Sequence, residues 1–287
     1  MGYAKQCRGR RPQGRRPDPP GPGSVSAAAA ASTGTVRAET RSGVLRLVLD
    51  RPHRGNALVP DLLDGCLDAL DTAGDIRAVV VTGAGRAFSA GGDVGEFRAR
   101  ADDREALLAY SERVVGTLNR VILRLRDMPC PVIAAVNGPV TGGSVGLMLA
   151  ADMILMDATA FIQPYYARMG FAPDGGWTAL MSERIGRART ARWLAFDERL
   201  DARGALAIGL VDRVVETGGM DAEIDRQLAA LEPLDPGLAL TSRHLLDAQI
   251  AGPDLAGRLD QEKREFLDRI AREDTRARMN AFLAGAK

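Results

Sequence analysis

Two glycine-rich turns are the residues of this chain whose types and spacing most clearly suggest chemistry. The first contains Ala90–Asp93 (AGGD), and the second contains Thr141–Ser144 (TGGS), about fifty residues later. Each follows a short apolar run typical of a buried strand and precedes a segment expected to be helical. N–H groups at such a helix start are unpaired and lie at the positive end of the helix dipole. One N–H from each turn could bind the same oxygen and stabilise negative charge on a carbonyl, whereas the alternative is two tight connections that bind nothing.

Asp174 is the candidate for proton transfer. It lies in the segment GFAPDGGW, among small residues and close to Phe171 and Trp177. A carboxyl group in an apolar pocket should have a raised pKa, which makes it a better proton carrier near neutral pH. The alternative is structural, because an aspartate before two glycines is also a good helix N-cap.

The apolar pattern predicts the elements that position these residues. Strands are expected over 44–50, 79–82, 132–136 and 153–156, and helices over 93–98, 105–126 and 145–151, with another beginning at Pro60. Beyond Val211 the chain is expected to be mainly helical. Strands that alternate with helices favour an α/β fold with parallel strands.

Composition excludes several classes of protein. The net charge of +1 over 287 residues gives no reason to expect a nucleic-acid partner. The three cysteines are scattered, without metal spacing or a disulfide framework, and fit a reducing, cytoplasmic compartment. With two histidines, no metal site is expected. No apolar run reaches the roughly 18 residues that a membrane span needs.

Residues 1–35 differ from the rest of the chain. Arginines there stand among prolines and glycines, and an alanine run follows. Because this composition cannot form a core, a disordered and dispensable tail is predicted. A targeting peptide and a nucleic-acid-binding arm are the alternatives.

Several motifs occur in an order that resembles the crotonase (enoyl-CoA hydratase/isomerase) superfamily: LDRPHRGNAL, AFSAGGD, PVIAAVNGPVTGG and GFAPDGGW. The resemblance extends from about Val36 to the C-terminus. It implies a β-β-α spiral core over residues 36–235 and a helical C-terminal region over 236–287, which packs at a trimer interface or over its own active site. The apolar positions of the segment 255–270 are predicted to need a partner, and a homotrimer or hexamer is expected.

The resemblance also implies roles for individual residues. The oxyanion donors would be the N–H groups of Gly92 and Gly143. An acyl-CoA substrate, with no further cofactor, would be bound by His53, Arg54, Gly55, Ala57, Ala90, Gly92, Asp93, Val94, Tyr166, Trp177 and Phe282. A basic residue common in the family falls on Gly95, and Arg54 or Lys263 would have to replace it.

The acidic residues decide which reaction is expected. The two glutamates of family hydratases fall on Gly146 and on Tyr165 or Tyr166, so both are absent and standard hydration is disfavoured. Related isomerases that act on dienoyl-CoA or ring-epoxide thioesters carry an aspartate at the position of Asp174. The sequence therefore predicts a thioester isomerase with one aspartate as proton shuttle. A hydratase or other thioester-enolate lyase, and a catalytically silent binding protein of the same fold, are the alternatives.

Overall fold

A computed structural model describes residues 31–32, 35–250 and 252–285. Its strands are β1 (Ala31–Ser32), β2 (Val36–Arg41), β3 (Val44–Leu49), β4 (Ala78–Gly83), β5 (Val132–Val136), β6 (Val140–Thr141), β7 (Met153–Asp157), β8 (Phe161–Gln163), β9 (Leu200–Asp201) and β10 (Arg213–Val215). Its α-helices are α1 (Pro60–Asp71), α2 (Val94–Arg100), α3 (Arg104–Arg126), α4 (Val145–Leu149), α5 (Tyr166–Met169), α6 (Met181–Ile185), α7 (Arg187–Phe196), α8 (Ala202–Ala207), α9 (Met220–Leu231), α10 (Gly237–Asp247), α11 (Leu255–Ile270) and α12 (Glu273–Gly285). Two short 3-10 helices cover Pro52–Arg54 and Gly142–Ser144.

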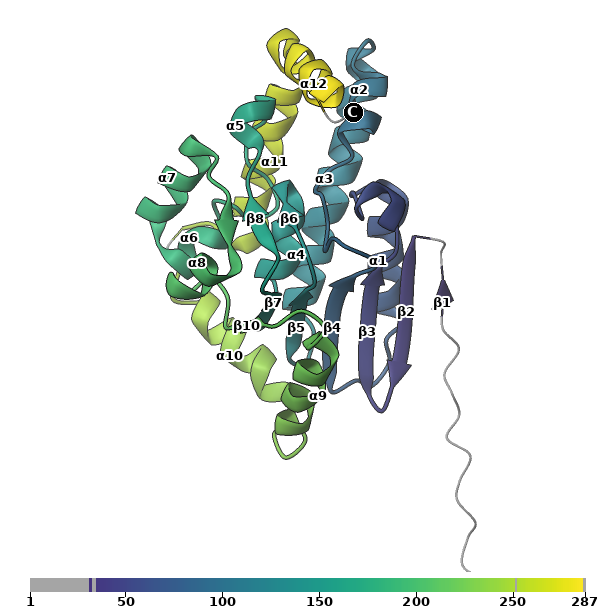
Figure 1. Ribbon diagram of the computed structural model, residues 1–287, viewed down its shortest axis with the longest axis vertical. Coiled ribbons are helices and arrows are strands. Elements are labelled where there is room, and N and C mark those ends of the chain that lie inside the picture. Colours follow the sequence, from purple (N-terminus) through teal and green to yellow (C-terminus); the bar gives the residue numbers. More distant parts are fainter. Residues whose placement is uncertain (1–30, 33–34, 251, 286–287) are drawn as a thin grey trace, which may run out of the picture.

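The strands form a large sheet and a small one (Figure 1). The order of the large sheet is β1-β2-β3-β4-β5-β7-β10, with parallel pairing from β3 to β10 and antiparallel pairing at the β1–β2–β3 edge. The small sheet has the order β6-β8-β9. This arrangement confirms the predicted α/β fold. The antiparallel edge was not predicted, because only Val36 and Ala38 of the six residues of β2 are buried, so this strand carries little apolar signal.

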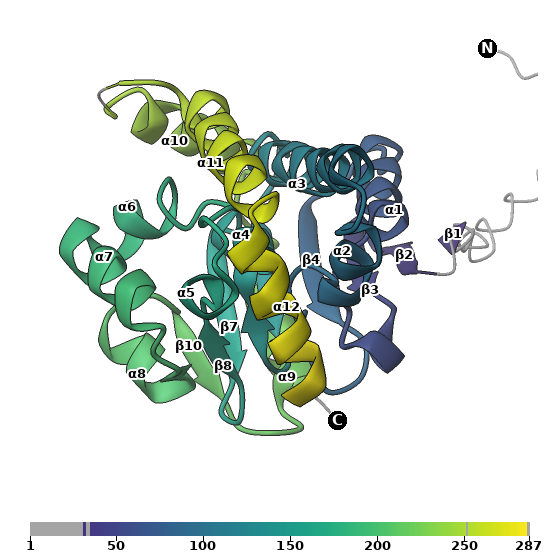
Figure 2. The same cartoon turned by 90° about the horizontal axis from the view of Figure 1, so that it is seen from above.

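Each central strand is buried on both faces. In β5, Val132, Ala134 and Val136 face the main core, and the alternating Ile133 and Ala135 face a smaller cluster. Helices α1 and α3 cover the first face, as Figure 2 shows, and residues of α9 complete the second. Burial on both faces explains why these strands are continuous apolar runs in the sequence.

Helix α11 corrects one expectation. Leu255, Leu259, Phe266 and Ile270 were predicted to need a partner, but they are buried in this chain's own core. The helix lies against α3, so α3 covers the apolar face. The alternative position of the C-terminal region, over its own active site, describes α11 better. A trimer or hexamer stays a prediction that rests on the family resemblance.

Most of the segment predicted as a tail, residues 1–30 and 33–34, lies outside the described residues. Ala31–Ser32, within the same segment, pair with Arg37 and Ala38 of β2 as the edge strand β1. The predicted boundary at residue 35 therefore includes two residues whose backbone joins the sheet. Across the described residues, no helix has the length and apolarity needed to cross a membrane.

Candidate active site

The two glycine-rich turns lie directly against each other. Thr141 donates its N–H to the carbonyl of Ser89 at 3.1 Å. A Cβ built on Gly91 would lie 2.8 Å from the carbonyl oxygen of Thr141. Gly91 and Gly142 also have φ angles of +79° and +53°, which side chains disfavour. Glycine is therefore favoured at Gly91 by the close approach of the turns and by its φ angle, and at Gly142 by its φ angle alone.

The two predicted oxyanion donors are available for a ligand. The Gly92 N–H donates to no acceptor in the described part of the chain. Gly143 lies in the first turn of a 3-10 helix, where N–H groups have no acceptor within the helix. Both residues line one cavity. An oxygen placed in the cavity at these turns would meet unpaired backbone donors.

The carboxylate of Asp174 lies beside the second turn. A Cβ built on Gly143 would be 2.7 Å from Oδ2 and 2.9 Å from Oδ1 of Asp174. Gly175, the residue after Asp174, also packs against the second turn, since a Cβ on Gly175 would be 2.2 Å from the carbonyl oxygen of Gly143. Gly175 and Gly176 have φ angles of +64° and +86°, so the tight loop depends on both glycines. The predicted base and one of the predicted oxyanion donors therefore share one corner of the cavity.

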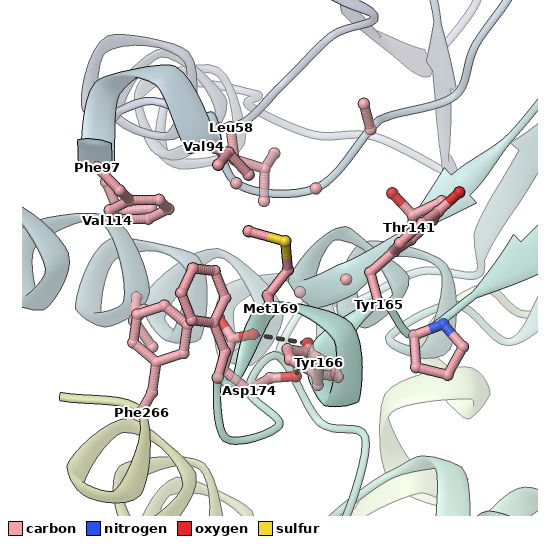
Figure 3. A pocket seen from close by; sticks show the side chains of 18 of the residues that line it. Leu58, Val94, Phe97, Val114, Thr141, Tyr165, Tyr166, Met169, Asp174 and Phe266 are labelled. Carbon is pink, nitrogen blue, oxygen red and sulfur yellow. Dashed lines mark hydrogen bonds between the residues drawn. The ribbon is translucent and has the colours of Figure 1, made fainter. Parts of the chain in front are cut away.

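Tyr166 is the hydrogen-bond partner of Asp174. Its hydroxyl donates to Oδ1 at 2.6 Å, as the dashed line in Figure 3 shows. Burial raises the pKa of Asp174 to about 7, the Tyr166 hydrogen bond opposes this shift, and the charge of Glu262 adds to it. Burial and Asp174 raise the pKa of Tyr166 well above its usual range, so Tyr166 remains a donor. Asp174 caps no helix here, since α6 begins only at Met181.

The cavity around these groups is mainly apolar and has a volume of about 250 Å³. One end is lined by Phe97, Phe171 and Phe266, whose ring centroids are 5.2 to 6.1 Å apart. In Figure 3 Phe97, Val114 and Phe266 lie on one side, and Thr141 and Tyr165 on the other. The polar side chains that line it are Thr141, Tyr165, Tyr166 and Asp174.

Comparison with known proteins shows the family to which the chain belongs. The family model described as enoyl-CoA hydratase/isomerase matches residues 39–287. The chain belongs to the enoyl-CoA hydratase/isomerase family.

Its relatives carry both names. The chain is 30% identical over 254 residues to 1,2-epoxyphenylacetyl-CoA isomerase of Escherichia coli. The aligned region covers 87% of this chain and 95% of the relative. It is 34% identical over 178 residues to a probable enoyl-CoA hydratase of Rhodobacter capsulatus. That aligned region covers 62% of this chain and 67% of the relative. A solved enoyl-CoA hydratase from Bacillus halodurans shares the fold with a TM-score of 0.80 at 23% identity, covering 86% of this chain and 99% of that one. Family membership therefore leaves the reaction open.

Gly146, which stands at the position of one hydratase glutamate, has no space for a side chain. A Cβ built on Gly146 would lie 2.3 Å from the carbonyl oxygen of Gly175 and 2.4 Å from Cδ1 of Ile122. Any side chain at this position would have to displace the backbone that follows Asp174. The other glutamate position falls on Tyr165 or Tyr166. Tyr165 has a left-handed φ of +64°, and its N–H donates to Asp197 Oδ1 at 2.6 Å, while the Tyr166 hydroxyl donates to Asp174. Neither position offers a carboxylate to the cavity.

The loop predicted to bind CoA lies next to the first turn. Gly55 accepts a hydrogen bond from the Ala90 N–H at 2.8 Å. Asp93 caps α2 and pairs with Arg51 at 2.7 Å and Arg54 at 3.0 Å. Burial raises the pKa of Asp93, but the two arginines outweigh it and lower the pKa below its usual range. Asp93 therefore fastens the loop to the turn.

The predicted site residues fall into three groups: residues that line the cavity, residues beside it, and Trp177, which lies behind it. Ala90, Gly92, Val94, Gly143, Tyr166, Asp174 and Phe282 line it. His53, Arg54, Gly55 and Ala57 belong to the adjoining loop, and Asp93 belongs to the end of the first turn, where it caps α2. Trp177 is not part of the wall, because it is fully buried behind the turn, where its Nε1 donates to the Gly142 carbonyl at 2.8 Å.

Sequence reasoning missed one buried carboxylate beside the site. Glu262 on α11 is 4% exposed and accepts hydrogen bonds from the backbone that follows Asp174. One signal for it was present. Glu262 occupies an apolar-stripe position of the helix, between Leu259 and Phe266, where a charge needs buried partners.

Proposed function

We propose that this protein is an acyl-thioester isomerase that moves a carbon–carbon double bond. The thioester oxygen accepts hydrogen bonds from the Gly92 and Gly143 N–H groups. Ionised Asp174 removes a proton next to the carbonyl or at its vinylogous position, and the electron pair forms an enolate. Asp174, now protonated, returns the proton two carbons away, so the electron pair re-forms the shifted double bond. One carboxyl group thus serves as base and then as acid.

The position of Asp174 against Gly143 carries this proposal. A base beside an oxyanion donor can reach a proton near the carbonyl that the donor binds. Its raised pKa is matched to proton transfer near neutral pH. Hydration would need a second carboxylate to orient water, and the steric closure at Gly146 argues against one there.

The lining of the cavity supports an apolar acyl group. Phe97, Phe171 and Phe266 line one end of it, and the polar side chains are those near Asp174 and Thr141. We infer that the thioester carrier is coenzyme A, which is part of the substrate, and that the protein acts in the cytoplasm as a trimer or hexamer. A carrier-protein thioester is the alternative.

A panel of 2-enoyl- and 3-enoyl-CoA thioesters in deuterated water tests the proposed reaction. Isomerisation gives a shifted double bond and no gain of water. Deuterium enters the carbon that receives the proton only to the extent that protonated Asp174 exchanges with solvent before it returns the proton. Accumulation of a hydroxyacyl product would instead identify a hydratase. No reaction with any thioester, together with tight binding, would indicate the silent binding protein.

The pH dependence should report the ionisation of Asp174. Because the base must be ionised, kcat/KM should rise with pH through a midpoint near the Asp174 pKa of about 7 and level off above it. Two pH units below the midpoint, about one hundredth of the plateau should remain. The measurement is kcat/KM from pH 5 to 9 at constant ionic strength. A midpoint near that of a solvated aspartate would contradict a buried base.

Arg54 is expected to take the place of the basic residue missing at position 95. A Cβ on Gly95 would lie 3.0 Å from Nη2 of Arg54, and the Arg54 side chain is 47% exposed, so further donors face solvent. Arg54→Ala should raise KM for CoA thioesters roughly fivefold, which corresponds to about 1 kcal/mol, with kcat unchanged. Arg51 would still hold Asp93.

Thioesters of N-acetylcysteamine, which lack the CoA phosphates, provide the control for Arg54→Ala. Their KM should be the same for the wild type and the variant. An equal loss with both carriers would show that Arg54 supports the loop and not a phosphate.

A further inference from the structure

Glu262 is a buried carboxylate that the mechanism above does not use. Its Oε2 accepts the Gly176 N–H at 2.7 Å. Its Oε1 accepts the N–H groups of Thr178 at 2.8 Å and Ala179 at 2.9 Å, and the Thr178 hydroxyl at 2.5 Å. All these donors lie two to five residues after Asp174. Four donors directed at two oxygens fit an ionised carboxylate, which has acceptor sites for all of them.

We propose that Glu262 is a positioning residue, which clamps the loop after Asp174 from helix α11 and so holds the Asp174 carboxylate against Gly143. The inference rests on the proposed function, because it assigns Glu262 a part in that reaction. Glu262 does not line the cavity, so it acts through the loop.

The loop needs such a clamp because of its own sequence. Asp174 is followed by two glycines in left-handed conformations, which have more backbone freedom than other residues. On one side Gly175 packs against Gly143, and on the other Glu262 binds Gly176 and the turn after it. Helix α11 packs against α3, where the Asn119 side chain donates to the Leu259 carbonyl at 3.0 Å, and its Phe266 packs against Phe97 of α2. The carboxylate of Glu262 is therefore a rigid anchor.

Glu262 also affects Asp174 through its charge. Tyr166 from α5 and Glu262 from α11 are the ionisable side chains that act on Asp174, and Glu262 raises its pKa. Burial raises the pKa of Glu262, and its four hydrogen bonds oppose that shift. Arg258, four residues before Glu262 on α11, donates to the Ala179 carbonyl and pairs with Glu183.

Glu262→Gln tests the inference, with Glu265→Gln as the matched control on the exposed face of the same helix. Glutamine keeps the size but loses the charge, and its NH₂ group would face either the Gly176 N–H or the Thr178 donors. The kcat of Glu262→Gln with a 3-enoyl-CoA should fall on the order of 10- to 100-fold, because small misplacements of a catalytic group are costly, while KM changes less than threefold. The pH midpoint of kcat/KM should move to lower pH. Glu265→Gln should match the wild type in all three quantities.

Titration of ¹³C-carboxyl-labelled aspartates by NMR gives a readout that does not require activity. The Asp174 signal, assigned with Asp174→Asn, should titrate at lower pH in Glu262→Gln. If the wild type isomerises nothing, the proposed function fails, and this titration still decides whether Glu262 acts on Asp174.

A merely structural Glu262 would give a different result. Glu262→Gln would then lower the melting temperature but keep the wild-type kcat, the pH midpoint of kcat/KM and the midpoint of the Asp174 NMR titration. That result would overturn the inference. If Glu262→Gln does not fold, Thr178→Val removes one donor and keeps the backbone N–H. A several-fold loss of kcat at constant KM supports the clamp, and wild-type kcat in Thr178→Val overturns it.

Discussion

Asp174→Asn is expected to abolish isomerisation while the variant still folds and binds acyl-CoA. An amide cannot accept the substrate proton, and the mechanism has no second base. General acid–base catalysis contributes up to about 10⁴-fold, and this variant should lose nearly all of it. Tyr166 can still donate to Oδ1, so the loop and the two oxyanion donors should keep their geometry. The dissociation constant of a 3-enoyl-CoA should therefore change only a few-fold.

The stability of Asp174→Asn should depend on pH in a defined direction. The folded-state pKa of Asp174, about 7, lies above the ordinary aspartate value of 3.8. Between these values the folded state binds more protons than the unfolded state, so this group destabilises the fold as pH rises. Asparagine does not ionise. The variant should therefore be more stable than the wild type at pH 8 and closer to it at pH 5, as thermal unfolding can measure.

Asp157→Asn is the control for this pair of measurements. Asp157 is equally buried, at 6% exposed, and accepts hydrogen bonds from Thr159 and Thr217 outside the cavity. Its variant should lose stability but keep kcat. If Asp174→Asn folds, binds and still moves the double bond at the wild-type rate, the single-aspartate mechanism is wrong.

The secondary structure that the sequence predicts best is the part that is buried on both faces. The run Val132–Val136 is apolar throughout, and the strand β5 has these same bounds. Helix α1 begins at Pro60, as the proline predicts. The strands β6, β8 and β9 were not predicted, because two or three residues show no periodicity and their pairing depends on distant segments.

The site shows the same distinction between local and distant signals. Gly92, Gly143 and Asp174 belong to motifs in which each residue is recognised from its neighbours, and the fold brings all three to one cavity. Glu262 lies more than eighty residues from the turn that it binds, and its neighbours carry no motif. Trp177 shows the reverse error. The motif next to the site implied that Trp177 binds substrate, but Trp177 does not line the cavity, and its indole N–H donates to the Gly142 carbonyl.

Gly146→Ala is expected to cost about 3 kcal/mol of folding stability, at the high end for overpacking by one methyl group. The added Cβ would lie 2.3 Å from the Gly175 carbonyl oxygen and 2.4 Å from Ile122 Cδ1. Ile122 can change rotamer, but the Gly175 carbonyl is backbone. Chemical denaturation of Gly146→Ala and of Gly116→Ala measures the difference. Gly116 is a helical glycine of α3 whose Cβ would meet only Lys263 Cδ at 3.9 Å, so its variant should gain about 0.5–1 kcal/mol from helix propensity.

The same steric clash connects the stability of Gly146→Ala to the reaction. The Gly175 peptide directly follows Asp174, so a methyl group that displaces it should also move the carboxylate away from Gly143 and lower kcat in the folded fraction. Gly146→Glu, which restores a hydratase glutamate, adds a buried charge to this clash and should give no hydration with a 2-enoyl-CoA. A Gly146→Ala variant with wild-type stability would show that the Asp174 loop yields easily. In that case the closure of position 146 would no longer argue for isomerisation over hydration.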